Sequence, residues 1–153
     1  MDGMDLKILE LLQDDGKLSY VALAHQVGLS VTAVKERVKR LKKDGVITGN
    51  HYLVNPHALR LEILAYVQVL MPVPAEEANF VKQMQMVPEV QECHSITGEY
   101  SYLLKIRVAN TRRLEELMSE KVTSIKGVIK TNSIITLTTF KEITQLPVSS
   151  YEK

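Results

Sequence analysis

The sequence predicts an α+β chain in which an N-terminal winged helix-turn-helix is followed by a ferredoxin-like βαββαβ domain. Up to Gly45, apolar residues recur at helical spacing between short glycine-containing turns, which is the pattern of a helix-turn-helix. Further along, strands with alternating apolar residues flank two more helices, in the order of the ferredoxin-like fold. The expected divisions are a helix-turn-helix domain at 1–55, a linker at 56–61 and a second domain at 62–153.

The composition is that of an ordinary globular protein. Of the 153 residues, 45% are hydrophobic and 24% are charged. The longest apolar runs are far shorter than the roughly 18 residues that span a bilayer, and the N-terminus lacks the basic and then apolar pattern of a signal peptide. Cys93 is the one cysteine, which excludes an internal disulfide and suits a reducing compartment. We expect a soluble cytoplasmic protein without a membrane partner.

Three helices are predicted in the first part of the chain. Asp5 can cap the first helix, which ends before Gly16. Ser19 and Ser30 have the residue type of N-caps for the second and third helices, and Gly28 can take the left-handed conformation between them. The turn of about three residues that separates the last two helices is the spacing of a helix-turn-helix.

The third predicted helix, over residues 31–43, concentrates positive charge. Its six cations stand against one acidic residue, Glu36, although the whole chain has a net charge of only +1. Val34, Val38 and Leu41 recur at i, i+4 and i+7 and form one apolar stripe, so the other faces are polar. A basic helical face is often merely solvated, but the preceding helix and turn favour recognition of double-stranded DNA.

Within this helix, position along the axis predicts the type of DNA contact. Residues near the N-terminal end of a recognition helix face base edges, and flanking cations contact phosphates. The predicted base-contacting residues are Thr32, Ala33, Lys35 and Glu36, the last suited to a cytosine amino group. The predicted phosphate-contacting residues are Lys39, Arg40 and Lys43. Ser30 and Arg37 complete the predicted set, and Arg37 is expected to be partly structural because it lies closer to the apolar stripe.

The segment after the third helix is predicted to be extended. Residues 46–54 are rich in β-branched and aromatic side chains. Asn55-Pro56 is a turn signal that ends the segment. We therefore expect a wing-like strand that leads into the linker.

The second domain is predicted to contain four strands and two helices. The strands are 62–71, 90–96, 101–109 and 129–141, and the helices are 75–86 and 111–124. The first and last strands carry apolar residues on both faces, whereas the helices of such a fold cover one face only. The uncovered apolar face predicts a homodimer packed sheet to sheet.

Catalysis and metal binding find little support in the sequence. Cys93 and His94 are adjacent, and neighbouring side chains on a strand point to opposite faces, so they cannot easily act as a nucleophile and its base. His25, His51 and His57 lack metal-ligand spacing with one another and with Cys93. The sequence also contains no phosphate loop and no dinucleotide-binding glycine pattern. We expect neither an enzyme nor a bound cofactor.

Several motifs, spread in order over nearly the whole chain, resemble those of the Lrp/AsnC regulators. They are LSYVALA at 18–24, VGLS at 27–30, RVKRL at 37–41, DGVI at 44–47, PEV at 88–90, TGEYSYLLK at 97–105 and IKGV at 125–128. The resemblance implies a DNA-binding regulator that dimerises through the ferredoxin-like domain and often assembles further, for example into octamers.

The same resemblance implies an amino-acid effector bound between dimers. Carried over to this chain, the effector-binding residues are Gly98, Glu99, Tyr100, Ser101 and Tyr102. Glycine allows close approach of a ligand to the backbone, and hydroxyl groups can orient its polar groups. Many members have aspartate at the position of Ser101, where a carboxylate suits the ammonium of the ligand. Two alternatives stay open: the segment is only a hairpin turn, or the protein is an architectural DNA-wrapping protein without an effector.

Overall fold

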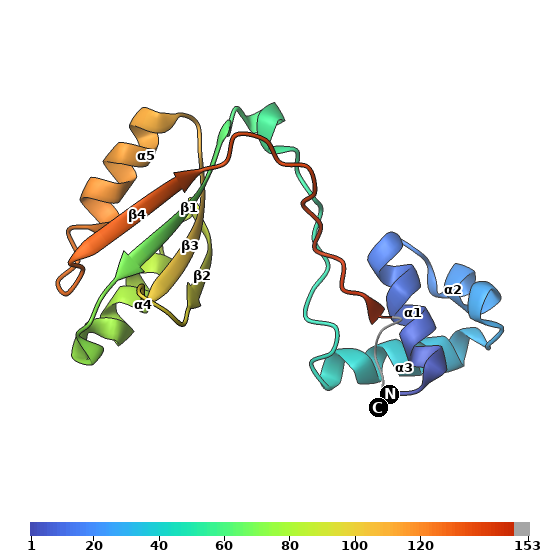
Figure 1. Ribbon diagram of the computed structural model, residues 1–153. Helices are drawn as coiled ribbons and strands as arrows, with labels where there is room; N and C mark the ends of the chain where they lie inside the picture. Colours follow the sequence, from blue (N-terminus) through green and yellow to red (C-terminus); the bar gives the residue numbers. More distant parts are fainter. Residues whose placement is uncertain (149–153) are drawn as a thin grey trace. The chain divides into compact units, whose positions relative to one another are not determined.

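The computed structural model describes residues 1–148 and divides the chain into two compact units (Figure 1). Among the described residues, one unit consists of Met1–Leu53 together with residues 141–148, and the other is Val54–Phe140. The sequence assigned the segment after residue 140 to the second domain, whereas the structure groups it with the first. Residues 149–153, the end of the predicted second domain, lie outside the described residues.

Three helices form the N-terminal unit: α1 (Gly3–Asp14), α2 (Tyr20–Val27) and α3 (Val31–Lys43). Each contributes apolar side chains to one small core. The fully or almost fully buried members are Ile8, Leu23, Ala24, Val27, Val34 and Val38. Gly28 ends α2 with a φ of 70°, in the left-handed region that favours glycine. The predicted helix-turn-helix is therefore confirmed.

The helix caps agree with the sequence at two of three positions. Ser19 and Ser30 accept hydrogen bonds from the backbone N–H groups of Ala22 and Ala33, at 3.1 and 3.2 Å. The predicted cap of α1 was wrong, because Asp2 caps this helix and Asp5 occupies its third position. The two aspartates form a capping box, in which each side chain accepts from the other's backbone N–H at 2.9 Å.

The wing-like strand predicted at 46–54 is not present in the described part of the N-terminal unit. A strand needs a neighbour for its backbone groups, and no other strand occurs within residues 1–53. Side chains hold the segment instead. Asn50 donates to the carbonyl oxygen of Gly16 at 3.0 Å, and the Lys17 ammonium lies 4.9 Å from the centre of the Tyr52 ring. A short 3-10 helix, Pro56–Leu59, follows in the predicted linker.

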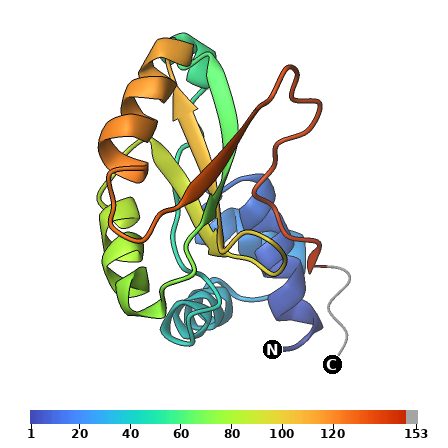
Figure 2. The ribbon, with the colours of Figure 1, turned by 60° about the vertical axis from the view of Figure 1, so that its left-hand side comes forward.

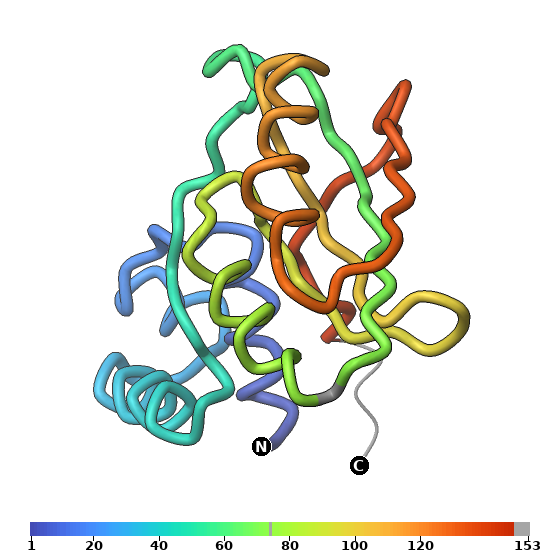
Figure 3. The backbone as a smooth tube through the Cα atoms, turned by 90° about the vertical axis from the view of Figure 1, so that its left-hand side faces the viewer, coloured from blue at the N-terminus to red at the C-terminus, as the bar shows by residue number. Residues whose placement is uncertain are grey.

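The second unit has the predicted βαββαβ order. Its elements are β1 (Ile63–Leu70), α4 (Glu77–Gln85), β2 (Val90–Ser95), β3 (Tyr102–Val108), α5 (Thr111–Leu117) and β4 (Lys130–Ile135). All strand pairs are antiparallel, and the order across the sheet is β2-β3-β1-β4. Figures 2 and 3 show α4 and α5 on the same side of this sheet. A 3-10 turn, Pro74–Glu76, precedes α4, and one π-helical turn, Met118–Val122, extends α5.

Strand β4 is shorter than the predicted strand of 129–141. Ile135 pairs with Ala65, and the N–H of Thr136 still donates to the carbonyl oxygen of Leu64. β1 begins at Ile63, so few pairing positions remain for β4 beyond this point. Without a paired neighbour its backbone groups lose their ladder hydrogen bonds, and β4 ends near the start of β1.

The core of the second unit lies between the sheet and its two helices. Ala65, Val67 and Val69 of β1 are fully buried on the covered face, as the alternation predicts. Phe80 of α4 is also fully buried, and its ring centre lies 4.8 Å from that of Tyr102. Within the described residues of this unit, no helix covers the other face of the sheet. No helix in the described part of the chain is long and apolar enough to cross a membrane.

The segment after residue 140 is held against α1 by amide groups. The side chain of Gln13 donates to the carbonyl oxygen of Leu146 at 3.1 Å and accepts from its N–H at 2.7 Å. The side chain of Gln145 donates to the carbonyl oxygen of Gln13 at 3.1 Å. These bonds explain why this segment belongs to the N-terminal unit.

Two methionines of the α4 region provide a matched test of this core. Met84 is 1% exposed and Met86 is 78% exposed. We expect Met84→Ala to lower the free energy of unfolding by about 2–5 kcal/mol, because it leaves a cavity. Met86→Ala should change it by less than about 0.5 kcal/mol. Urea denaturation measures both, and equal losses would contradict the described packing.

Candidate nucleic-acid interface and ligand loop

Helix α3 has the two-sided character that its sequence predicts. Val34, Val38 and Leu41 are buried and hold the helix on the core of its unit. The remaining faces are polar. The exposed residues are Val31, Thr32, Lys35, Glu36, Lys39, Arg40, Lys42 and Lys43, and the half-buried ones are Ala33 and Arg37. All four lysines of the helix therefore reach solvent, together with the residues predicted to contact bases.

The two arginines of α3 are bound to α1. Nη1 of Arg37 lies 2.7 Å from Oδ2 of Asp2 and 2.7 Å from Oδ1 of Asp5. Nη2 of Arg40 lies 2.9 and 2.8 Å from the two carboxylate oxygens of Asp5. Asp5 is 0% exposed. A buried carboxylate needs charged partners to remain ionised, and the two guanidinium groups supply them.

This network shifts the acid–base equilibria of its members. The backbone N–H of Asp5 and then the Arg37 guanidinium lower the pKa of Asp2 to about 2. Burial opposes ionisation of Asp5, but the backbone N–H of Asp2 and the Arg37 guanidinium outweigh it and hold the pKa of Asp5 below its ordinary value. The same contacts raise the pKa of Arg37. The network is therefore fully charged at neutral pH.

The network divides the six cations of α3 into two groups. Arg37 lies closest to the apolar stripe and uses its guanidinium to join α3 to α1. Arg40, a predicted phosphate contact, is also bound to Asp5, but its side chain is 52% exposed and keeps an outer edge in solvent. Among the described residues, the four lysines of α3 have no carboxylate partner. They are cations that this helix presents to solvent. The sequence predicted a partly structural Arg37, but it did not indicate the ion pair between Arg40 and Asp5.

The loop between β2 and β3 contains the residues that the resemblance associates with an effector. Gly98 has a φ of 114°, and a Cβ built there would meet open space. Ser101 is used for structure: its backbone N–H donates to Val69 at 2.9 Å, and its hydroxyl donates to the carbonyl oxygen of Met71 at 3.0 Å. The N–H of Met71 in turn donates to that hydroxyl at 3.1 Å.

Tyr102 also lies away from the loop surface. It begins β3, and strand alternation turns its side chain toward the helices, where it is 5% exposed and packs on Phe80. Burial raises the pKa of its phenol. Of the five residues predicted for effector binding, the structure presents Gly98, Glu99 and Tyr100 together at the loop. Ser101 and Tyr102 instead hold the loop to the sheet and core.

Lys130, a residue that the sequence did not single out, contacts two residues of the loop. Nζ of Lys130, the first residue of β4, lies 2.8 Å from Oε1 of Glu99 and 5.3 Å from the centre of the Tyr100 ring. The hydrogen bond from Lys130 to Glu99 raises the pKa of this lysine. Only the pairing of β4 with β1 brings residue 130 next to the loop, so no local pattern could have indicated it.

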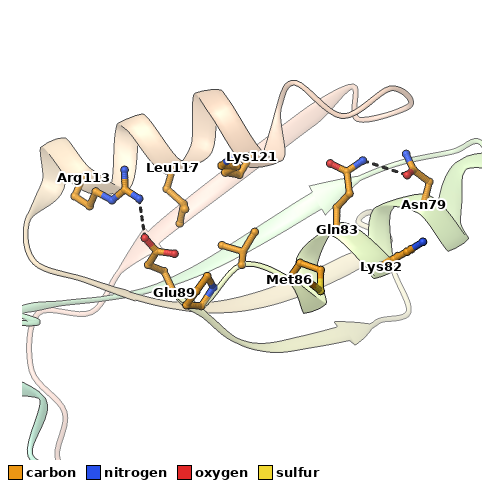
Figure 4. A pocket seen from close by; sticks show the side chains of 10 residues that line it. Asn79, Lys82, Gln83, Met86, Glu89, Arg113, Leu117 and Lys121 are labelled. Atoms are coloured by element: carbon orange, nitrogen blue, oxygen red, sulfur yellow. Dashed lines mark hydrogen bonds and ion pairs between the residues drawn. The ribbon is translucent and has the colours of Figure 1, made fainter.

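A groove of about 610 Å³ lies on the helical side of the second unit (Figure 4). Residues of α4, α5 and the segment between α4 and β2 line it, and Arg113 binds Glu89 across one end at 2.7 Å. This ion pair lowers the pKa of Glu89. Among the described residues, no three histidine, cysteine or acidic side chains are placed to hold a metal ion.

Both units match families of known proteins. Residues 1–48 match the family described as winged helix-turn-helix DNA-binding, and residues 64–146 match the Lrp/AsnC ligand binding domain. The chain is 36% identical to the proline dehydrogenase transcriptional activator of Rhizobium radiobacter, with 93% of this chain and 92% of the relative covered. It is 35% identical to the leucine-responsive regulatory protein of Escherichia coli K12, with coverages of 98% and 93%.

The chain belongs to the Lrp/AsnC family. A transcriptional regulator from Neisseria meningitidis, solved as a complex with L-methionine, superposes with a TM-score of 0.92 at 29% identity and covers 97% of each chain. This Lrp/AsnC protein is accordingly a DNA-binding transcriptional regulator, and the fold predicted from its sequence is confirmed.

The Asp5 network generates a stability prediction. We expect Asp5→Asn to lower the free energy of unfolding of the N-terminal unit by about 2–3 kcal/mol, because Arg37 and Arg40 lose a charged acceptor. Glu10→Gln, on the exposed side of the same helix, is the matched control and should have little effect. Thermal and urea unfolding measure both variants. An Asp5→Asn variant as stable as the control would contradict a structural role for this carboxylate.

Acid should weaken the same network. The pKa of Asp2 is lower in the folded chain than its ordinary value of 3.8, so its contribution is complete above that value and is lost as the pH falls toward about 2. We expect the unfolding midpoint to decrease between pH 4 and pH 2, and Asp2→Asn to make this decrease shallower. Thermal unfolding over this pH range measures both decreases. A variant whose midpoint falls as steeply as that of the wild type would contradict the prediction.

Proposed function

We propose that this Lrp/AsnC regulator reads double-stranded DNA with the exposed face of α3, as a cytoplasmic homodimer whose DNA binding responds to an amino acid at the Gly98 loop. The observation that carries the proposal is the division of α3 into a buried apolar stripe and an exposed face with four solvated lysines. We assign no catalytic residue and no cofactor to the chain.

The contacts with DNA follow from the position of each residue along α3. Thr32, Ala33, Lys35 and Glu36 lie in the first turns and are assigned to base edges. Ser30 orients these turns as the N-cap. Lys39 and Lys43 lie further along and are assigned to phosphates. Arg40 can add a phosphate contact through its outer edge, while Asp5 holds the other edge, and Arg37 acts through its support of the helix.

A two-fold dimer would place two copies of α3 on one DNA site. The face of the sheet without helices carries the half-buried Tyr66 and Leu70 of β1 and the exposed Ile134 of β4. A second copy of this face is a suitable cover for these side chains. Dimers of helix-turn-helix proteins contact half-sites about 34 Å apart, one turn of DNA. We propose further assembly, such as an octamer, on the family resemblance alone.

An amino acid is the proposed effector because the loop is exposed and a close structural neighbour was solved with L-methionine. Gly98, Glu99 and Tyr100 lie at the loop, with open space beside Gly98. The alternative is an architectural DNA-wrapping protein of the same fold without an effector. It uses the same helix and the same dimer, so only a test with ligands separates the two.

The salt dependence of DNA binding tests the assignment of the lysines. Each phosphate contact contributes about 0.9 to the slope of log Kobs against log salt concentration. We expect Lys39→Ala and Lys43→Ala each to reduce the slope by about this amount, and Arg40→Ala to reduce it less, because Asp5 already binds its guanidinium. Lys82→Ala, in the second unit, is the control. Unchanged slopes in both α3 lysine variants would refute the phosphate assignment.

Titration with the twenty amino acids tests the effector. We expect L-methionine or a related apolar amino acid to bind, as measured by calorimetry, and to change the DNA dissociation constant. Thermodynamic linkage requires that DNA then changes the affinity for the amino acid by the same factor. If no amino acid gives heat or alters DNA binding, the architectural alternative is correct.

A further inference from the structure

The loop holds a pair of opposite charges that matches the charges of a free amino acid. We infer that Glu99 and Lys130 recognise the effector as a zwitterion, with Glu99 contacting its α-ammonium and Lys130 its α-carboxylate. The inference deepens the proposed effector function and rests on it. Lys130 thereby becomes a binding residue although it lies far from the loop in the sequence.

Ser101 stands where many family members have an aspartate, so the carboxylate that contacts the ligand's ammonium must come from another residue. A hydroxyl at this position could in principle accept from an ammonium, but both of its hydrogen bonds go to the backbone of Met71. Glu99 is the one acidic residue between Ile96 and Tyr102. Its side chain is 65% exposed. The negative charge that an ammonium requires is therefore supplied by Glu99.

Lys130 provides the positive charge in a defined place. Its backbone is fixed by pairing with Leu70 at the start of β4. Its ammonium lies 2.8 Å from Glu99 and 5.3 Å from the centre of the Tyr100 ring, a distance at which a cation is attracted to the ring. The side chain is nevertheless 53% exposed. The ammonium is thus positioned by two neighbours and accessible to a ligand.

The loop backbone offers further donors beside this pair. Within the described residues, the N–H groups of Gly98, Glu99 and Tyr100 have no acceptor in the protein. A φ of 114° and open space at Gly98 allow a small ligand to approach them. Backbone N–H groups of this kind bind carboxylates well. These N–H groups can donate to an α-carboxylate that lies beside Lys130.

Opening the pair for a ligand costs little. An ion pair between exposed side chains contributes little stability, because water already solvates both charges. Inserting a zwitterion replaces this single contact by two, one at each end of the ligand. An amide or an N-acyl derivative lacks one of the two charges and gains only one contact, and a peptide carries its two terminal charges further apart than a free amino acid does. The pair therefore selects free amino acids.

Calorimetry with three forms of one amino acid tests the inference on the full chain. The probes are L-methionine, L-methioninamide, which lacks the carboxylate charge, and N-acetyl-L-methionine, which lacks the ammonium. If the screen proposed above selects another amino acid, the same three forms of it serve. The proteins are wild type, Glu99→Gln, Lys130→Gln and the control Lys126→Gln, which removes a surface pair with Glu76 of the same 2.8 Å length.

We expect Lys130→Gln to weaken L-methionine about tenfold or more and to abolish the preference for L-methionine over its amide, while the preference over the N-acetyl form persists. Glu99→Gln should show the opposite pattern. Lys126→Gln should bind like wild type, and all variants should keep the wild-type unfolding midpoint because the substituted side chains are exposed.

Two results would overturn the inference and are distinguishable from each other. If wild type binds the amino acid and both variants keep its affinity and its preferences, the inference fails but the effector function stands. If wild type binds none of the twenty amino acids, the effector function itself fails, and the inference fails with it.

Discussion

The contact between the buried carboxylate of Asp5 and the two arginines of α3 is the interaction on which the recognition surface depends. It joins the first and third helices of the N-terminal unit at a point where the apolar core ends. Because the carboxylate is buried and charged, its partners cannot leave without a large loss of stability. The orientation of α3 is therefore fixed by charge as well as by packing, and the lysines on its outer face are presented in one arrangement.

The fold was largely predictable because its patterns are local or periodic. Apolar spacing located every α-helix and strand of the second unit, though not the 3-10 helix at Pro56–Leu59, and residue types located two helix caps, Ser19 and Ser30. The errors occurred where a partner decides the outcome. The segment at 46–54 has strand-forming residues but no neighbouring strand among residues 1–53, and β4 stops at Ile135, near the start of its partner β1.

The site was predictable in its location but less so in the roles of its residues. The exposed face of α3 follows from helical periodicity, yet the capture of Arg40 by Asp5 depends on packing between helices that are far apart in the sequence. Likewise, the loop at Gly98 was found by resemblance. Strand alternation buries Tyr102, a contact with Met71 occupies Ser101, and strand pairing brings Lys130 beside Glu99. These are long-range consequences of the fold.

Lysine acetylation followed by mass spectrometry, with and without bound DNA, tests the central claim most directly. The account predicts that DNA protects Lys35, Lys39 and Lys43 of α3 from the reagent, because they lie at the interface. Lys82 and Lys126 of the second unit should keep their reactivity and serve as internal controls. Equal reactivity of the α3 lysines in the free protein and in the DNA complex would contradict the assignment of this helix as the DNA-binding surface.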